Sequence, residues 1–234
     1  MGLREAHRCL TVVRPRNKID VLMEAILGYR FLLVLFTIAA VSPCGFPQEK
    51  HAATARYDDL VAKLEAGDKN VNFKDLRLAY ADSTGGPDTD PQKKAMMVAL
   101  NSKNFEEALK NADIVLAGDY ADMDAHFVEY VANRELHNAD RSDFHKFVLQ
   151  GLLNSITGSG DGKSFETAFQ VIEVHEEYVL LRFMGLMPSK QSFAKKNGHS
   201  FDVLEAVNPK SNEKVTLYFN IDIEQKHLAD ALKQ

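Results

Sequence analysis

The stretch TGSGDGKS, Thr157 to Ser164, divides the sequence into two parts with different hydrophobic periods. Before it, from about Ala53, apolar residues recur every three to four positions, as on one face of an amphipathic helix. After it, apolar and polar residues alternate, as on a strand with one buried face. The sequence therefore predicts an α+β protein in which a helical layer precedes a small sheet, with the boundary at Gly158 to Gly162.

The same stretch ends in Gly162-Lys163-Ser164, as a phosphate-binding loop does. Such a loop needs a first glycine five positions before Gly162, but Thr157 stands there and Gly158 is one residue too close. It also follows a buried strand and opens a helix, whereas this stretch follows a helical pattern and precedes a strand-like one. The glycines therefore predict a turn-rich junction, and nucleotide binding is the least favoured function for this stretch.

Residues 53–156 are predicted to form antiparallel helix pairs. In NFEEALKNADIVLAGD, small Ala108 and Ala112 lie on the apolar stripe and would let a neighbouring helix approach closely. Helix, short turn and helix, repeated, resembles the tetratricopeptide pattern of roughly 34 residues, although its Trp-Leu-Gly signature is missing. The adjacent carboxylates Glu106-Glu107, Asp58-Asp59 and Glu176-Glu177 are interpreted as solvated, because neighbours in a helix do not converge.

Residues 163–223 are predicted to form a small antiparallel sheet packed on the helical layer. QSFAKK, SFDVLEAV and EKVTLYFNI form a three-strand meander, joined by Asn197-Gly198 and by NPKSN. TAFQVIEV could add a strand, and YVLLRF fits either a strand or a short helix. Residues 224–234 form an amphipathic tail. Because a small sheet needs a cover for its apolar face, the preceding helices are the expected cover.

Residues 1–45 are interpreted as an N-terminal extension and a secretory signal. The apolar run FLLVLFTIAAV, Phe31 to Val41, is too short to span a membrane but fits a signal hydrophobic region. Translation from Met23 instead of Met1 would bring this run closer to the N-terminus. We expect an exported protein, periplasmic or secreted, with no membrane span in the mature chain; a lipid anchor at Cys44 is the less favoured alternative.

Charge disfavours nucleic acid as a partner. Beyond residue 30 the chain carries 22 basic and 30 acidic residues, and an acidic surface repels phosphate backbones.

Histidines and tyrosines supply the candidate site residues. His126 and His145 lie on neighbouring predicted antiparallel helices, and His199 lies in a hairpin. No HExxH pattern occurs, so these histidines are more simply hydrogen-bonded or solvated than metal ligands. Tyr218 is a candidate for lining a groove between helices and sheet. No complete catalytic constellation is present, and no cofactor is expected.

Several ordered motifs resemble a bacterial family catalogued as domain of unknown function 4919. The motifs are FKDLRLAYADS (Phe73–Ser83), DAHF (Asp124–Phe127), GKSFETAFQVIEVHEEYVLLRFMGL (Gly162–Leu186), QSFAKKNGHSFDVLEA (Gln191–Ala206) and LYFNIDI (Leu217–Ile223). The resemblance implies an exported bacterial protein and assigns no catalytic residue. It also implies that GKSFETAF belongs to a recurring fold element.

These patterns favour an exported, non-enzymatic module of the bacterial envelope that contacts another envelope protein or a peptide through its helical layer. The alternative is a metal-binding protein or an enzyme with a histidine-containing site.

Overall fold

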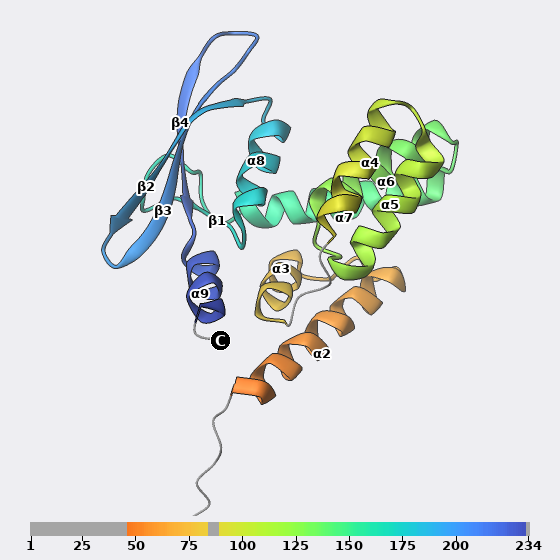
Figure 1. The fold of residues 1–234 in the computed structure, drawn as a ribbon, viewed down its shortest axis with the longest axis horizontal. Coiled ribbons are helices and arrows are strands. Elements are labelled where there is room, and N and C mark those ends of the chain that lie inside the picture. The colour runs from red at the N-terminus through yellow and green to blue at the C-terminus, as the bar shows by residue number, and fades with distance from the viewer. Residues whose placement is uncertain (1–45, 84–88, 233–234) are drawn as a thin grey trace, which may run out of the picture. The chain divides into compact units, whose positions relative to one another are not determined.

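A computed structural model describes residues 46–83 and 89–232 (Figure 1). The helical part contains α2 (Phe46–Glu65), α3 (Phe73–Asp82), α4 (Asp90–Asn101), α5 (Phe105–Gly118), α6 (Met123–Glu135) and α7 (Ala139–Thr157). Then follow β1 (Phe169–Gln170), α8 (Val174–Phe183), β2 (Met187–Lys196), β3 (His199–Val207), β4 (Lys214–Asn220) and α9 (Asp222–Ala231). The predicted α+β class is confirmed.

The expected export segment, including Phe31–Val41 and Cys44, lies outside the described residues. Among the helices that are described, none is both long and apolar enough to cross a membrane.

Short polar side chains set where several helices begin. The Asn72 side chain accepts hydrogen bonds from the backbone N–H groups of Lys74 and Asp75, at the start of α3. Asp122 Oδ1 accepts the N–H of Ala125 at 2.7 Å at the start of α6. Such caps satisfy backbone donors that the first helical turn leaves without partners.

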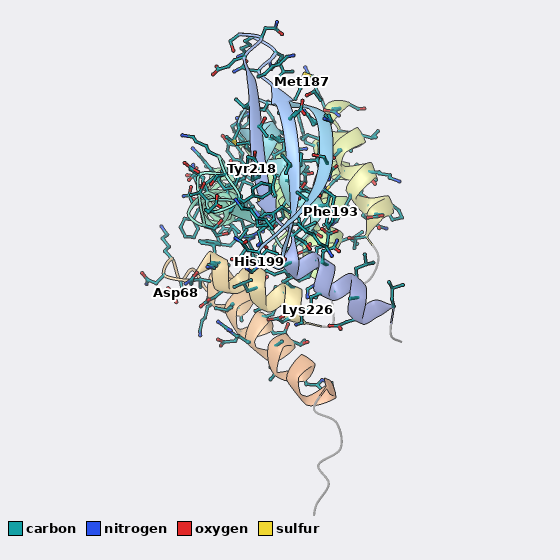
Figure 2. All side chains as sticks on the ribbon, turned by 90° about the vertical axis from the view of Figure 1, so that its left-hand side faces the viewer. Asp68, Met187, Phe193, His199, Tyr218 and Lys226 are labelled. Carbon is teal, nitrogen blue, oxygen red and sulfur yellow. The ribbon has the colours of Figure 1, made fainter. Side chains whose placement is uncertain are left out.

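The strands form one sheet in the order β1-β4-β3-β2. β2, β3 and β4 pair antiparallel, which confirms the predicted meander. β1 pairs parallel with β4, so the sheet is mixed and the prediction of a purely antiparallel sheet was wrong. The parallel pairing is possible because α8, β2 and β3 lie between β1 and β4 in the chain and supply the long connection that parallel strands need. Figure 2 shows Phe193 on β2 and Tyr218 on β4, two strands of this sheet.

The helix α8 lies against both the strands and the helical part. It contacts β2 on one side and α6 on the other. The segment YVLLRF, which fitted a strand or a helix, therefore belongs to a helix that packs on the sheet, and α9 on β3 and α7 on β1 add to this cover. Of TAFQVIEV, only Phe169–Gln170 pair as a strand.

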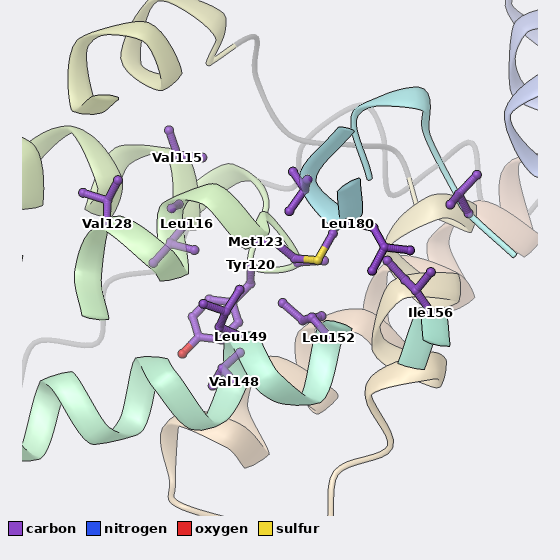
Figure 3. Close-up of a cluster of buried hydrophobic side chains, with 14 of the residues drawn as sticks. Val115, Leu116, Tyr120, Met123, Val128, Val148, Leu149, Leu152, Ile156 and Leu180 are labelled. Atoms are coloured by element: carbon purple, nitrogen blue, oxygen red, sulfur yellow. The ribbon is translucent and has the colours of Figure 1, made fainter. Parts of the chain in front are cut away.

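One apolar core runs through the helices and the sheet. Consecutive helices from α4 to α7 contact each other, and Ala108 and Ala112 are fully buried between them. Figure 3 shows Leu180 of α8 beside Leu152 and Ile156 of α7, in the same cluster. The cluster also includes Leu204 and other inward residues of the strands. The helical part and the sheet are therefore stabilised together.

Two glycines permit close contacts that a side chain would block. A Cβ on Gly151 of α7 would lie 2.2 Å from the Phe73 ring, so α3 packs directly on the α7 backbone. Gly162 adopts a positive φ of 67°, and a Cβ there would lie 2.3 Å from the Phe169 ring. The carbonyl of Gly162 accepts the N–H of Tyr218 at 2.9 Å, so the stretch between α7 and β1 is fastened to β4.

A buried ion pair joins the helical part to the sheet. The Arg77 Nε of α3 donates to Glu176 Oε1 of α8 at 2.7 Å, and Arg77 Nη2 pairs with Glu176 Oε2. Both side chains are 3% exposed. The guanidinium also donates to Ser155 Oγ and to the Gln170 carbonyl, each at 3.1 Å. One side chain thus connects α3, α7, β1 and α8.

Removing one partner of this pair should destabilise the whole protein. We expect Arg77→Met to lower the free energy of unfolding by about 3–5 kcal/mol, because Glu176 would remain buried without its counter-charge. Arg77→Met/Glu176→Met should recover part of the loss, since neither charge then remains. Denaturant unfolding measures both variants. A loss below about 1 kcal/mol for the single variant, the range of exposed pairs, would contradict the role given to this ion pair.

Candidate functional site

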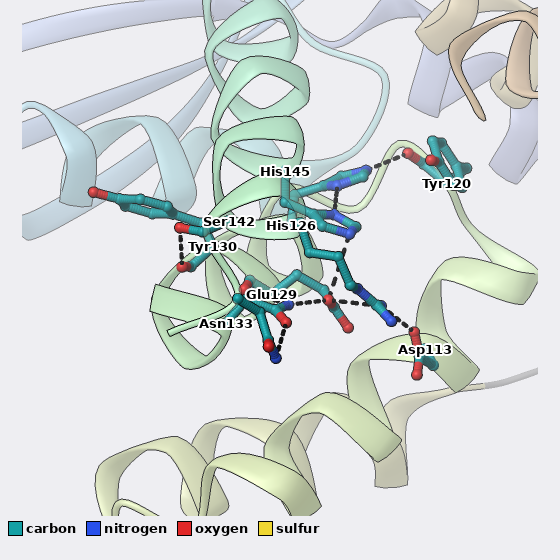
Figure 4. A network of polar contacts seen from close by, with 10 residues as sticks. Asp113, Tyr120, His126, Glu129, Tyr130, Asn133, Ser142 and His145 are labelled. Atoms are coloured by element: carbon teal, nitrogen blue, oxygen red, sulfur yellow. Dashed lines mark hydrogen bonds and ion pairs between the residues drawn. The ribbon is translucent and has the colours of Figure 1, made fainter. Parts of the chain in front are cut away.

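The structure brings His126 of α6 and His145 of α7 together in a buried polar network (Figure 4). Their Nδ1 atoms lie 2.9 Å apart, and His126 Nε2 lies 2.9 Å from the Tyr120 carbonyl oxygen. His145 Nε2 lies 3.4 Å from Glu129 Oε2, which also accepts from Arg141 Nη2 at 3.1 Å. The network therefore runs from a backbone carbonyl through two rings to a buried carboxyl group.

The hydrogen bonds fix the tautomers of both rings. A carbonyl oxygen can only accept, so His126 Nε2 must carry a hydrogen toward Tyr120. A neutral imidazole has one N–H, so His126 Nδ1 accepts and His145 Nδ1 donates. His145 Nε2 is then left without a hydrogen when its ring is neutral. A proton held by Glu129 could pass to this nitrogen.

The surroundings keep both rings neutral. Burial lowers the pKa of His126 to about 4. Burial, together with the neighbouring charge of His126, lowers the pKa of His145 to about 3. Burial also raises the pKa of Glu129 to about 7, against the opposing effect of Arg141. Near neutral pH, Glu129 is therefore the group in this network that gains or loses a proton.

The structure does not bring the other two predicted site residues to this network. His199 Nδ1 lies 2.6 Å from Asp222 Oδ2, at the junction of β3 and α9. Tyr218 packs against Phe165, with ring centroids 4.7 Å apart. Within residues 46–83 and 89–232, no three histidine, cysteine, aspartate or glutamate side chains gather in a way that could hold a metal ion.

The GKS stretch has the surroundings of a turn. Lys163 is highly exposed, and its N–H donates to Asp161 Oδ1 at 3.0 Å. Ser164 Oγ lies 3.1 Å from Thr167 Oγ1. The stretch leads into β1 and not into a helix, so the context that a phosphate loop requires is absent at this position.

Sequence reasoning missed a group of acids at the junction between α4, α6 and α8. Burial, and then the charge of Asp122, raises the pKa of Asp119 to about 8. Lys93 Nζ lies 2.8 Å from Asp122 Oδ2. Burial, and then the charge of Glu176, raises the pKa of Glu173. These residues come from separate segments, so only their distance in the fold could reveal the group.

A second group of acids lies under α9. Glu177 of α8 is fully buried, and neither of its carboxyl oxygens has a hydrogen-bond partner in the described part of the chain. Burial, and then the charges of Asp202 on β3 and Glu224 on α9, raises the pKa of Glu177 to about 9. The interpretation of Glu176-Glu177 as a solvated pair was wrong, because α8 is covered by the sheet and by α9 on that side.

Large apolar side chains are exposed along α8 and β2. We call Tyr178, Met184, Met187 and Phe193 the α8–β2 surface. Phe183 of α8 is also exposed, but its ring packs against Phe127 of α6, with centroids 5.7 Å apart. Figure 2 shows Met187 and Phe193 along the sheet. Met187 is 57% exposed and Phe193 is 54% exposed. Tyr178 Oη donates to Gln191 Oε1 at 2.5 Å, which joins the two elements side by side.

The strand β2 forms one edge of the sheet. It pairs with β3 and has no second neighbour among the described strands. Every second residue of an edge strand directs its backbone N–H and C=O groups away from the sheet. A register shift between Pro188 and Lys190 interrupts the pairing near one end, which leaves Lys190–Lys196 as the regular part of the edge.

The fold and these contacts define an α+β protein with a helical part, a mixed four-stranded sheet and an apolar surface beside a sheet edge. The model of the family described as "Domain of unknown function (DUF4919)" matches residues 49–229, and the chain belongs to this family. No curated protein and no solved structure matches the chain.

The buried network makes a prediction about histidine tautomers. At pH 6 we expect His126 as the neutral Nε2–H tautomer and His145 as the neutral Nδ1–H tautomer, because their pKa values lie near 4 and 3. Nitrogen chemical shifts of the rings measure this, with His145→Ala used for assignment. A protonated imidazolium at either position at pH 6 would overturn the arrangement.

The burial of Glu177 predicts how the free energy of unfolding depends on pH. Its pKa is about 9 in the folded protein and about 4.5 when unfolded, so the folded state binds more protons in this window. The free energy of unfolding should fall as pH rises through this window, by about 4 kcal/mol between pH 5 and pH 8 from this group alone.

We expect Glu177→Gln to remove that part of the pH dependence, as measured by denaturant unfolding at pH 5 and pH 8. Glu205→Gln, at an exposed position on β3, is the matched control and should keep the slope of the unchanged protein. Equal slopes for Glu177→Gln and the unchanged protein would show that Glu177 does not hold a proton.

Proposed function

We propose that this protein is an exported, non-enzymatic interaction module of the bacterial cell envelope, and that it binds a partner protein or peptide along the α8–β2 surface. The observation that carries this proposal is the exposed apolar side chains of α8 and β2 beside a sheet edge that no other described strand pairs with. Exposed apolar surface of this kind marks interaction sites. Export is supported by the signal-like pattern of residues 1–45.

The edge of β2 favours an extended partner segment. An added strand would satisfy the outward backbone groups of β2, and its alternate side chains would contact Phe193 and Tyr178. The strand β2 carries Lys190, Lys195 and Lys196 and no acidic residue, although Lys190 pairs with Glu205 on β3 and Lys196 pairs with Glu166. Two copies paired at this edge would therefore bring like charges together. An acidic extended segment of another protein fits the edge better than a second copy of this chain.

This location differs from the helical layer on which the sequence alone placed the contacts. The exposed large apolar residues described on the helical layer are Val98 of α4 and Ile114 of α5. Each is a single exposed side chain on its own helix, and single exposed apolar residues are normal on protein surfaces.

The alternative function, a metal-binding protein or an enzyme with a histidine-containing site, has the contact between His126 and His145 in its favour. Both nitrogens of His126 are already engaged, however, in hydrogen bonds to Tyr120 and His145. Stoichiometric zinc or another transition metal in the purified protein, lost on His126→Ala, would support this alternative over the interaction module.

The proposed surface can be tested by capture from envelope extract of the source bacterium. We expect Met187→Ser/Phe193→Ser to lower recovery of captured partners by about tenfold, because two exposed apolar side chains of β2 are removed from the proposed contact. The matched control, Val98→Ser/Ile114→Ser, removes two exposed apolar side chains from the helical layer and should leave recovery unchanged. Quantitative mass spectrometry measures each partner.

Three results would count against the proposal: no partner above background with the unchanged protein, equal losses with both double variants, or a loss only with the control. Circular dichroism of each variant establishes that it remains folded.

A further inference from the structure

A pocket that plays no part in the proposed contact lies on the helical part, at the end of α2 and between α5 and α7. Its volume is about 560 Å³. Leu116 and Ala117 of α5 form an apolar side, and Tyr120 and Phe144 supply aromatic rings. His145 of the buried network also lines it. The pocket can therefore cover an apolar stem and contact it with aromatic faces.

Acidic side chains surround this pocket. Glu65 of α2, Asp113 of α5 and Asp140 of α7 line it, and Arg141 is the one cation among its described lining residues. Arg141 is already paired, because its Nη2 lies 3.2 Å from Asp113 Oδ1 and 3.1 Å from Glu129 Oε2. Glu65 and Asp140 are left to give the pocket a negative potential.

A buried carboxyl group behind Arg141 adds to this potential when it is ionised. Glu129 has no exposed surface, and its Oε1 has no hydrogen-bond partner in the described part of the chain. The pKa of Tyr120 is raised, by burial first and then by the charges of Glu65 and Glu129. The Tyr120 side chain at the pocket therefore lies in the field of carboxylates from two different helices.

We propose that this pocket binds an organic cation, an ammonium or guanidinium group carried on an apolar stem. Carboxylates at the rim attract the charge, and aromatic faces favour a desolvated cation. The same rim repels carboxylate and phosphate ligands. A bare metal ion fits poorly, because no metal-holding group of acids and histidines forms among the described residues. Such a cation is either a free amine or a lysine or arginine side chain of a partner.

Titration with a matched pair of small molecules tests the charge requirement. Butylammonium and 1-butanol share a stem and differ in charge. We expect butylammonium to shift the amide signals of Leu116, Tyr120 and Phe144 saturably, with a dissociation constant of about 1 mM. Butanol should bind roughly tenfold more weakly. Added salt should weaken butylammonium binding, because exposed charges are screened.

The two sources of the cation are separated by a second pair of probes. A blocked Gly-Lys-Gly peptide carries the ammonium on a lysine side chain, and a blocked Gly-norleucine-Gly peptide lacks it. Tighter binding of the lysine peptide than of butylammonium would assign the pocket to a partner's side chain. Tighter binding of butylammonium would assign it to a free amine.

Variants at the rim test whether these acids carry the interaction. We expect Glu65→Gln/Asp140→Asn to weaken cation binding roughly three- to tenfold, since each exposed charge contributes a modest amount. Asp143→Asn is the matched control, because it removes one acid from the exposed side of α7 outside the pocket. It should leave binding unchanged.

The proposal fails if neither the amine nor the lysine peptide gives saturable shifts, or if butanol binds as well as butylammonium. It also fails if Asp143→Asn weakens binding as much as the rim variant. These outcomes are independent of the capture experiment, which concerns β2 and α8.

Discussion

The ion pair between Arg77 and Glu176 is the interaction on which the rest of the structure depends. Two opposite charges taken out of water are tolerated only when their hydrogen bonds are nearly complete. Here the guanidinium also donates hydrogen bonds to Ser155 Oγ and to the Gln170 carbonyl. Glu176 Oε2 accepts the Ile172 N–H at 2.8 Å. These partners come from α7, β1 and the turn before α8. Because both buried charges need these partners, the ion pair fixes where the sheet meets the helices.

Burial of further acids follows from the same junction. Where α8 enters between the sheet and the helical part, Glu177 becomes buried on one side and Glu173 partly buried at the start of the helix. Asp119 and Glu129 are buried deeper in the helical part. Burial raises the pKa of each of these four carboxyl groups. The folded protein thus holds protons that the unfolded chain releases, whereas His126 and His145 oppose this by remaining neutral.

The helix α8 has two different roles on its two sides. Val179, Leu180 and Leu181 belong to the common core, while Tyr178 remains exposed beside Gln191 of β2. The proposed binding surface therefore includes part of α8, the helix that the buried ion pair holds in place. The pocket between α5 and α7 is separate and differs in chemistry. Its acids favour a positively charged ligand, whereas the α8–β2 surface offers apolar contact and backbone pairing.

The sequence by itself determined the order of helices before strands, the meander from β2 to β4 and the turn-like character of Gly158 to Gly162, because these depend on local periodicity and on glycine. It also singled out His126 and His145, although it could not show that their rings touch. Only the tertiary structure decided that β1 pairs parallel with β4, that α8 is a helix and covers the sheet, and that Glu177 is buried. An apolar run of six residues fits a strand or a helix equally well, and an acid's solvation depends on what packs over it. Both are settled by contacts between residues far apart in the chain.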